Sequence, residues 1–277
     1  DGARELEPLP TAPLMLDKGR IVEHLRESLR IETISYQDPA QMPYDRFLEF
    51  HAFLEKAFPR VHAKLEREVI ADYSLLYMWK GTDSSRPPIL LMAHQDVVPI
   101  TSPDDWTHPP FSGDLADGFI WGRGALDDKS SLVGIFEALE ALLAEGFRPS
   151  RTILVASGHD EEVGGVRGAG AIAETLKRRG IRPQFSLDEG MAVLEGIVPG
   201  VSKPVAMIGI AEKGYLTLEL TVQAEGGHSS QPPKQTAIGI LSAAIAKLET
   251  NPFPGGLSGP MRRTFEYVGP EMSFLLR

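Results

Sequence analysis

The chain of 277 residues is 42% hydrophobic and 24% charged, a composition typical of a folded globular protein with a sizeable core. Its formal net charge of −10 would repel both a nucleic acid backbone and an anionic membrane surface, so we expect neither as a partner. The absence of cysteine excludes disulfides, thiolate zinc sites and cysteine nucleophiles, so any metal must bind histidine and carboxylate side chains.

No apolar run reaches the roughly 18 residues that a membrane-spanning helix needs, so we expect no membrane span in this chain. The opening residues 1–13 are polar and contain prolines, and they lack the basic start and apolar middle of an export signal. If such a signal existed, we expect it to have been removed. The cellular compartment therefore stays open.

Helices and strands are predicted to alternate through the first two thirds of the chain. Apolar residues at helical spacing predict amphipathic helices at 17–30 and 44–58. Short apolar runs at 88–93 and 151–156 are typical of strands buried on both faces. Two more helices are predicted at 126–145 and 168–179, and a further short run follows at 184–187. This order predicts an α/β domain whose sheet is covered on both sides.

The pattern changes after Gly214. Alternation of apolar and polar residues over 215–222 predicts a strand with one buried face, and 235–249 reads as an amphipathic helix. We place the domain boundary near 211–214, which gives a first domain of residues 1–211 and a second of residues 212–277. The second is short for a domain that folds alone, so we expect it to be incomplete.

Two motifs flank the first predicted crossover. The segment AHQDVVP (93–99) puts His94 directly after a buried strand, where ligands collect in open α/β sheets, with Asp96 placed to orient its ring. The segment GRGALDDK (122–129) opens a helix, and it is no phosphate-binding loop because Asp128 stands where that motif needs glycine. Taken singly, each motif is equally typical of a solvated strand end or a capped helix start.

Two acidic clusters follow later strands. The segment HDEEVGG (159–165) holds three consecutive carboxylates that repel one another unless a cation neutralises them, and SLDEG (186–190) again places acids past a strand. A solvated acidic loop is the alternative for each. Because four such clusters occur at element ends on one predicted rim of the sheet, the sequence favours a zinc or hard-cation site there.

At this point the sequence resembles the cocatalytic dizinc exopeptidases, the family of glutamate carboxypeptidase, carboxypeptidase S, aminoacylase and succinyl-diaminopimelate desuccinylase. The resemblance runs nearly end to end and also rests on Trp106 with PPFSG (109–113) and on GGHSS (226–230). The segments GHDEE (158–162) and NPFP (251–254) look most like the carboxypeptidase S (Gly-Xaa carboxypeptidase) branch. The resemblance implies a three-layer zinc-exopeptidase-like catalytic domain and a partial α+β lid domain that mediates dimerisation.

Carried over by position, the resemblance makes Asp127 the carboxylate that bridges two zinc ions. His94 and Asp188 then complete one site and Glu162 binds at the other, while Glu161 is the general base and Asp96 orients His94. On the sequence alone the roles of the two glutamates could be exchanged. The resemblance also implies a cis peptide bond between Asp127 and Asp128, and it allows cobalt or manganese in place of zinc.

The resemblance gives His228 a role at the neighbouring active site of a homodimer, where it would hydrogen-bond the developing oxyanion. A lone loop histidine is otherwise a surface residue. The family has one more histidine, far towards the C-terminus, as the partner of Glu162 on its zinc, and no histidine follows His228 here. We therefore expect this chain to be the N-terminal portion of a longer enzyme, and the portion alone to be inactive or impaired.

The expected function is metal-dependent hydrolysis of an amide bond, either next to the C-terminal residue of a small peptide or in an N-acyl amino acid. The alternative is a relative or fragment that binds metal or peptide without catalysis. Serine hydrolysis is disfavoured because the chain has no Gly-x-Ser-x-Gly motif.

Overall fold

The computed structural model describes residues 14–210, 212, 214–228, 230–257, 259–272 and 275. These residues fall into two compact units, one of residues 14–189 and one from residue 190 onwards. Among the helices in the described ranges, none is both long and apolar enough to cross a membrane.

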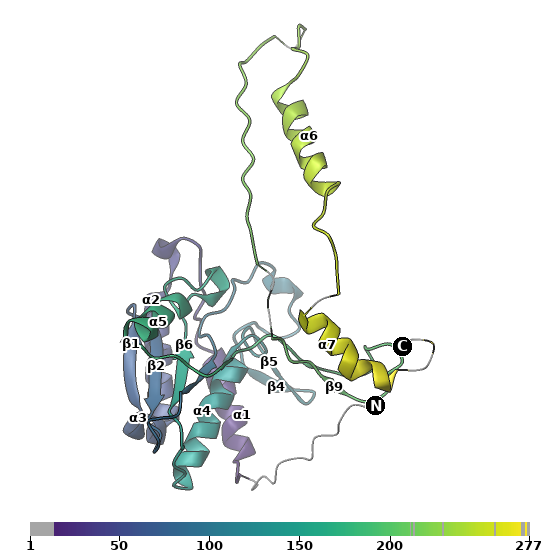
Figure 1. Ribbon diagram of the computed structural model, residues 1–277. Coiled ribbons are helices and arrows are strands. Elements are labelled where there is room, and N and C mark those ends of the chain that lie inside the picture. The colour runs from purple at the N-terminus through teal and green to yellow at the C-terminus, as the bar shows by residue number, and fades with distance from the viewer. Residues whose placement is uncertain are drawn as a thin grey trace. The chain divides into compact units, whose positions relative to one another are not determined.

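The first unit is an α/β fold with a five-stranded mixed sheet (Figure 1). The sheet contains β1 (Glu66–Ile70), β2 (Ser74–Trp79), β6 (Ile153–Ser157), β3 (Ile89–Met92) and β7 (Ser186–Leu187), in that spatial order. The strands β6, β3 and β7 run parallel to one another, whereas β1 and β2 pair antiparallel at the other edge. A separate two-stranded hairpin is formed by β4 (Asp114–Ala116) and β5 (Phe119–Trp121).

Helices cover both faces of this sheet. The helices of the unit are α1 (Lys18–Leu29), α2 (Tyr44–Ala57), α3 (Pro59–Lys64), α4 (Lys129–Ala144) and α5 (Ala169–Arg178). Short 3-10 turns lie at Pro39–Gln41, Pro103–Asp105 and Glu161–Val163. The predicted helices at 17–30, 44–58, 126–145 and 168–179 are all confirmed within a few residues. Asp17 caps the first of them by accepting a hydrogen bond from the backbone N–H of Arg20 at 3.1 Å.

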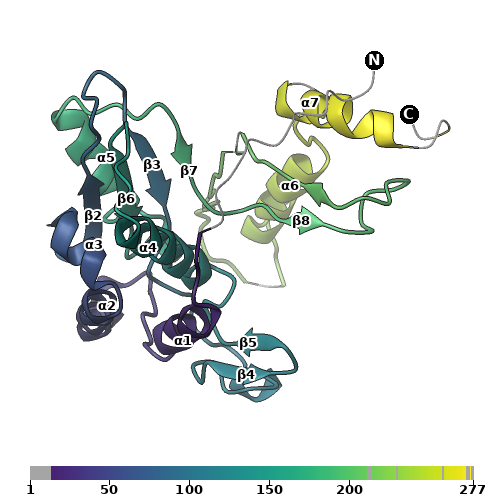
Figure 2. The ribbon, with the colours of Figure 1, turned by 90° about the horizontal axis from the view of Figure 1, so that it is seen from below.

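The period of two along the strands divides the core into two layers. Leu75 and Tyr77 of β2 pack with α2, α3 and α4 on one face, whereas Leu76, between them, packs with Ile172 of α5 on the other. Figure 2 shows the same sheet from below with its helices. The layers are therefore helix, sheet and helix, as the sequence predicts for the catalytic domain.

The two central parallel strands differ in how fully they are covered. The residues of β6 are buried apart from Ile153, as predicted, but all four residues of β3 are only half-buried. An open apolar groove of about 690 Å³ lies along Leu90 and Met92 of β3 and against α5. The prediction that 88–93 is buried on both faces is thus wrong for Ile89–Met92, because α5 covers this part of the sheet only in part.

The second unit holds β8 (Val193–Leu194) and β9 (Val205–Ala206), which pair antiparallel, then α6 (Ala237–Glu249), α7 (Gly259–Val268) and the 3-10 turn Gly269–Glu271. The helix predicted at 235–249 is confirmed as α6. The strand predicted at 215–222 is wrong, since the described residues there are extended but belong to no ladder. A strand needs a hydrogen-bonded partner, and this stretch has none among the described residues.

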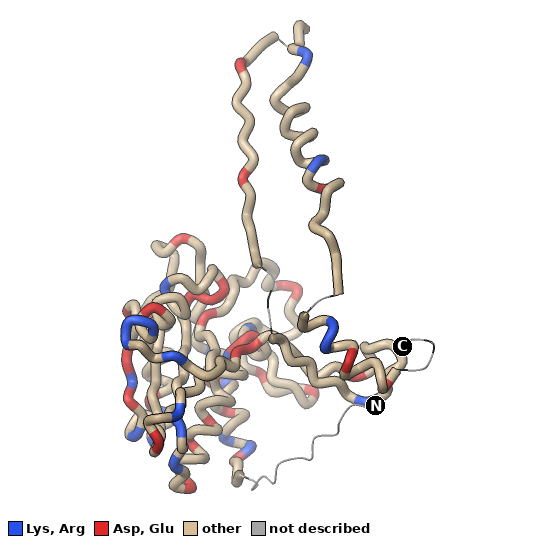
Figure 3. Tube along the Cα trace, in the orientation of Figure 1, with Lys and Arg blue, Asp and Glu red and all other residues tan. Residues whose placement is uncertain are grey.

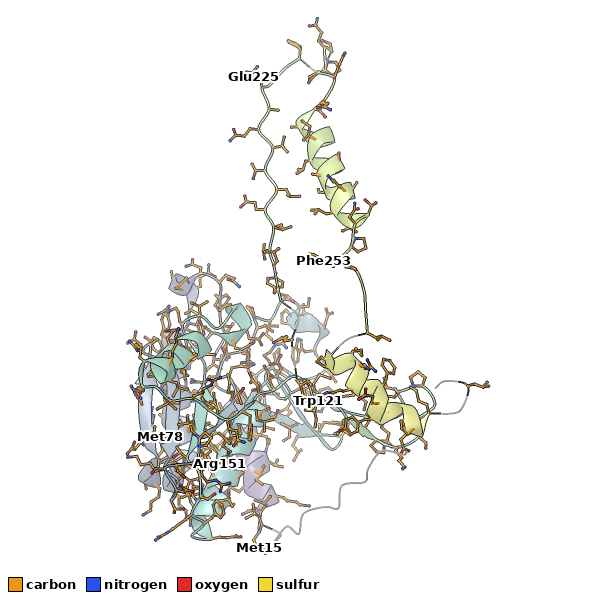
Figure 4. All side chains as sticks on the ribbon, viewed as in Figure 1. Met15, Met78, Trp121, Arg151, Glu225 and Phe253 are labelled. Atoms are coloured by element: carbon orange, nitrogen blue, oxygen red, sulfur yellow. The ribbon has the colours of Figure 1, made fainter. Side chains whose placement is uncertain are left out.

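Apolar side chains of the second unit are exposed to solvent. Tyr215 is 93% exposed, and Phe253, which Figure 4 labels, is 95% exposed. The apolar side predicted for α6 is present in the sequence, but no residue of that helix is buried.

Candidate metal centre

The acidic clusters predicted from the sequence meet at one edge of the sheet in the first unit. His94 follows β3, Glu161 and Glu162 follow β6, and Asp188 follows β7. Because these three strands are parallel neighbours, their carboxyl ends lie on the same edge. Figure 3 draws the acidic residues of these loops in red along the chain trace.

The imidazole of His94 lies at the centre of the cluster and is 3% exposed. Its Nε2 atom lies 2.9 Å from Oδ1 of Asp127, 3.1 Å from Oε1 of Glu189 and 3.8 Å from Oε2 of Glu161. Its Nδ1 atom faces the other way, 2.9 Å from the backbone oxygen and 3.3 Å from Oδ1 of Asp96. One ring nitrogen is thus held in place while the other faces the carboxylates.

Asp96 is fully buried and connects two strand ends. Its Oδ1 atom accepts a hydrogen bond from the backbone N–H of Glu161 at 3.0 Å, and its Oδ2 atom accepts one from Glu162 at 3.1 Å. The same carboxylate therefore orients both His94 and the acidic turn. This arrangement agrees with the orienting role that the sequence predicts for Asp96.

The acidic turn that follows β6 is closed by its own backbone. The N–H of Gly164 donates to the carbonyl of Glu161 at 2.8 Å, and the N–H of Gly165 donates to the carbonyl of Asp160 at 2.7 Å. Gly164 has a φ of 105°, a left-handed conformation that favours glycine. Glu161 and Glu162, which begin this turn, belong to two different groups of possible metal ligands around His94.

The described residues contain two groups whose ligand atoms all lie within 4.8 Å of one another. One group is His94, Asp127 and Glu162, and the other is His94, Glu161 and Glu189. The structure thus brings three of the four predicted metal ligands together. The fourth, Asp188, lines the adjoining groove and belongs to neither group.

Glu189 is a possible ligand that the sequence motifs do not single out. It directly follows Asp188, and both are acidic residues past the end of β7, so the motif contained the signal. Which of two adjacent side chains points inward depends on the turn, and spacing alone does not settle it.

Burial and mutual repulsion shift the titration of these carboxyl groups. Burial, assisted by nearby carboxylates, raises the pKa of Glu161 and Glu162 above the ordinary value, and it raises the pKa of Glu189 to about 7. For His94, burial acts to lower the pKa, but the hydrogen bond and charge of Asp96 outweigh it and raise the pKa to about 10. The carboxylates around His94 thus favour a positive charge at the centre.

The peptide bond between Asp127 and Asp128 is cis, as the resemblance implies. Asp128 is buried, and its Oδ2 atom accepts a hydrogen bond from the backbone N–H of His94 at 3.2 Å. The loop that carries Asp127 is in this way joined directly to the end of β3.

A groove of about 690 Å³ opens beside the centre. His94, Glu161 and Asp188 line one part of it, and Met92, Ala169 and Ala173 form an apolar wall along β3 and α5. The remaining predicted site residue, His228, is exposed and lies in the second unit, so its role stays a prediction.

The family model for peptidase family M20/M25/M40 matches residues 90–268, which is more than half of the chain. The chain belongs to this family. It is 46% identical over 261 residues to the probable carboxypeptidase S-like 2 of Dictyostelium discoideum, covering 93% of this chain and 50% of that protein. It is also 46% identical over 261 residues to the N-fatty-acyl-amino acid synthase/hydrolase PM20D1 of Mus musculus, covering 93% and 52%. The chain therefore spans about half the length of these relatives.

Solved structures of this M20 family support the fold. Human carnosine dipeptidase 1 matches with a TM-score of 0.52 at 20% identity, covering 64% of this chain and 40% of that one. The M20 family metallo-carboxypeptidase Sso-CP2 from Sulfolobus solfataricus matches with a TM-score of 0.52 at 20% identity, covering 67% and 40%. At this identity the likeness concerns the fold alone.

Proposed function

We propose that the natural protein hydrolyses an amide bond at this centre with the help of divalent metal ions. The observation that carries the proposal is the meeting of one buried imidazole with carboxylates from four acidic residues at the carboxyl edge of three parallel strands. Family membership implies a divalent metal, and we propose zinc, as a pair of ions, with cobalt or manganese as alternatives.

The side chains present fit such ions. Ligand atoms around one tetrahedral zinc lie roughly 3.3–3.5 Å apart, given bond lengths of about 2.0–2.2 Å to nitrogen and oxygen. The Nε2 atom of His94 lies 2.9 Å from the Asp127 carboxylate and 3.1 Å from the Glu189 carboxylate, within reach of this spacing. Imidazole and carboxylate groups are also the metal ligands that this chain offers, since it contains no cysteine.

We assign His94, Asp127 and Glu162 as residues that would hold the ions, with Asp127 as the carboxylate that both would share. The fourth ligand would be Asp188, as the resemblance implies, or the adjacent Glu189, whose carboxylate lies 3.1 Å from Nε2 of His94. Bound divalent ions supply two things, polarisation of the amide carbonyl and a lowered pKa for an attacking water. Because Asp96 holds Nδ1 of His94, the Nε2 atom, which faces the carboxylates, would be the nitrogen that binds a metal.

We assign proton transfer to Glu161. Its backbone is fixed by the hydrogen bond to Asp96, and its side chain is half-exposed at the groove, where a substrate amide can approach. It would take a proton from the attacking water and return it to the leaving amine. The same side chain also lies near His94 and Glu189, so the alternative is that Glu161 binds metal and Glu162 moves the proton.

The substrate classes follow from the relatives' names. One relative is named carboxypeptidase S and others are named N-fatty-acyl-amino acid synthase/hydrolase, so we propose small peptides with a free C-terminus and N-acyl amino acids as substrates. We further propose that residues 1–211 form the catalytic domain, and that residues 212–277 begin a lid domain through which the protein forms a homodimer.

The test combines metal analysis with a screen of dipeptides and N-acyl amino acids on the natural protein. We expect bound zinc, hydrolysis, and loss of hydrolysis on chelation that zinc restores. The variant Glu161→Gln should keep its metal content and lose at least about 10²-fold in kcat, because it can no longer accept the proton.

Glu174→Gln provides the matched control, since Glu174 lines the same groove and makes no contact with His94 among the described interactions. It should retain nearly full activity. Loss of metal in Glu161→Gln would reverse the two glutamate roles. A metal-loaded protein that hydrolyses none of these substrates would instead support the alternative class, a relative that binds metal or peptide without catalysis.

A further inference from the structure

A buried lysine lies directly beside the metal centre. Lys129 is the first residue of α4, one peptide bond after Asp128, and its side chain is fully buried. Its Nζ atom donates hydrogen bonds to the backbone oxygen of Ser28 at 2.9 Å and to that of Ile31 at 2.6 Å. The same atom lies 5.0 Å from the ring centroid of Phe50.

This position is costly on two counts. An ammonium group loses its hydration when it is buried, and a cation at a helix N-terminus faces the positive end of the helix dipole. The two carbonyl oxygens and the face of Phe50 offset part of this cost. An apolar residue of similar length would fill the same space among the core residues without this desolvation and dipole cost. Core packing alone therefore does not explain the lysine.

The carbonyl groups that Lys129 binds belong to the segment that supports the end of β3. The carbonyl of Ile31 also accepts a hydrogen bond from the N–H of Thr33 at 3.0 Å. Thr33 in turn donates through its hydroxyl to the backbone oxygen of Gln95 at 2.6 Å, and its own carbonyl accepts from Val97 at 3.0 Å. Asp96 lies between Gln95 and Val97 in the sequence, so these hydrogen bonds hold the backbone on both sides of it.

The loop that carries Asp127 packs against Lys129 and against Val97, which follows Asp96. The N–H of Lys129 donates to the carbonyl of Gly124 at 3.1 Å. Gly124 is in close contact with its surroundings, since a Cβ atom there would lie 2.9 Å from a methyl group of Val97 and 3.3 Å from Cδ of Lys129. Lys129 thus touches both the loop with Asp127 and the segment behind His94 and Asp96.

We propose that Lys129 is a positioning residue of the metal centre, which holds the loop bearing Asp127 in register with the strand end bearing His94 and Asp96. It acts by binding the carbonyl groups of Ser28 and Ile31 from the start of α4. Lys129 itself touches no metal ligand atom. The inference rests on the proposed function, because it assumes that these three side chains serve a bound metal.

The test measures zinc binding by the natural protein, its Lys129→Met variant and a Tyr77→Phe control. Met keeps the length and apolar character of the side chain and removes the donor. Tyr77 is fully buried, and its hydroxyl lies 3.0 Å from Nε2 of His62, so the control removes one buried hydrogen bond from the same core away from the centre.

We expect zinc to bind Lys129→Met about 10–100-fold more weakly than the wild type, as when a residue that orients metal ligands is lost, and Tyr77→Phe to bind within about threefold. The zinc-induced rise in Tm should shrink in Lys129→Met alone. Should Lys129→Met fail to fold, Lys129→Gln takes its place, since it keeps a donor of shorter reach, and the same weakening is expected.

Unchanged zinc affinity in the lysine variants, or an equal loss in Tyr77→Phe, would overturn the positioning role. The wild type serves as the reference for the proposed function itself. If the wild type binds no zinc, the metal centre and the role of Lys129 both fail. If it binds zinc and the lysine variants do so equally well, only the role of Lys129 fails.

Discussion

Among single residues, Asp96 connects the strand end that bears His94 with the acidic turn. It is fully buried and contacts His94 and the backbone of both glutamates of the acidic turn. Burial acts to raise its pKa, but the hydrogen bond and charge of His94 outweigh burial and lower that pKa. A buried carboxylate that stays ionised in this way can hold its three partners over the ordinary pH range.

His62, which lies away from the centre, leads us to a prediction about how the stability of the protein depends on pH. Its Nδ1 atom donates to the carbonyl of Phe58 at 2.9 Å, and the hydroxyl of Tyr77 lies 3.0 Å from its Nε2 atom. Burial lowers the pKa of His62 below the ordinary value of about 6.5. The folded state therefore holds the neutral ring, with Tyr77 as the donor to Nε2.

The sign of the effect follows from which state binds more protons. Between the lowered pKa and about 6.5 the unfolded chain binds the proton and the folded chain does not, so this residue's contribution to stability falls as the pH falls. We expect the free energy of unfolding to drop less between pH 7.5 and pH 5.5 in His62→Gln than in the wild type. Urea titrations at fixed metal concentration measure this difference, and an identical drop in both proteins would contradict it.

Among the elements, the helices with a clear apolar spacing and the apolar runs that form β3 and β6 were predicted, whereas β1 and β2 were not. The amphipathic helices α1, α2 and α5 were found because their apolar spacing is visible in the sequence. The strands β1 and β2 were not predicted, although β2 is a short apolar run of the same kind as β3 and β6.

The opposite error at 215–222 has a structural cause. The alternating pattern is clear in the sequence, but alternation describes only one face of a strand, and a strand also needs a neighbour to pair with. The described part of the chain supplies no such neighbour, and the segment is extended without a ladder. Pattern alone therefore predicts where a strand can form and not whether its partner is present.

The close packing between the acidic turn and α5 leads us to a prediction about stability. A Cβ atom on Gly168, which precedes α5, would lie 2.4 Å from Oδ1 of Asp160 and 3.1 Å from the backbone nitrogen of His159. Asp160 cannot move aside freely, because its other oxygen accepts a hydrogen bond from the N–H of Arg167 at 2.8 Å. Gly168→Ala should therefore destabilise the protein by about 1–3 kcal/mol.

Gly134 offers the matched control inside a helix of the same unit. A Cβ atom there meets nothing within 4 Å, and the residue lies within α4. Gly134→Ala should stabilise the protein by about 0.5–1 kcal/mol, since alanine loses less backbone entropy on forming a helix. Urea midpoints of the two variants should move in opposite directions. A Gly168→Ala variant as stable as the wild type would show that the turn adjusts without cost.

Across the whole molecule, the order of the motifs predicted more of the centre than any single motif did. His-x-Asp or a pair of acids is common on protein surfaces, but placement after β3, β6 and β7 brings them together in space. The choice between Asp188 and Glu189 was beyond the sequence, because it depends on how a turn rotates its side chains. The role predicted for His228 could not be judged from the sequence either, because the prediction involves a second subunit.

The predicted homodimer gives the means to test His228. If this histidine acts at the neighbouring subunit's active site, a chain with Glu161→Gln still supplies its His228 to a partner with His228→Ala, whose own Glu161 is intact. Each hybrid dimer then has one complete site and one that lacks both groups. Random exchange between the two inactive variants makes half of the dimers hybrids, so the mixture should reach about one quarter of wild-type activity.

The measurement is hydrolysis after the two variants have been mixed and allowed to exchange subunits, compared with each variant alone. A histidine that acts within its own chain cannot produce recovery, because every site would still lack Glu161 or His228. Absence of recovery in a mixture that demonstrably exchanges subunits would therefore place His228 in its own subunit's site or outside catalysis. Activity of His228→Ala alone distinguishes these two, since only a histidine without a catalytic role leaves that variant fully active.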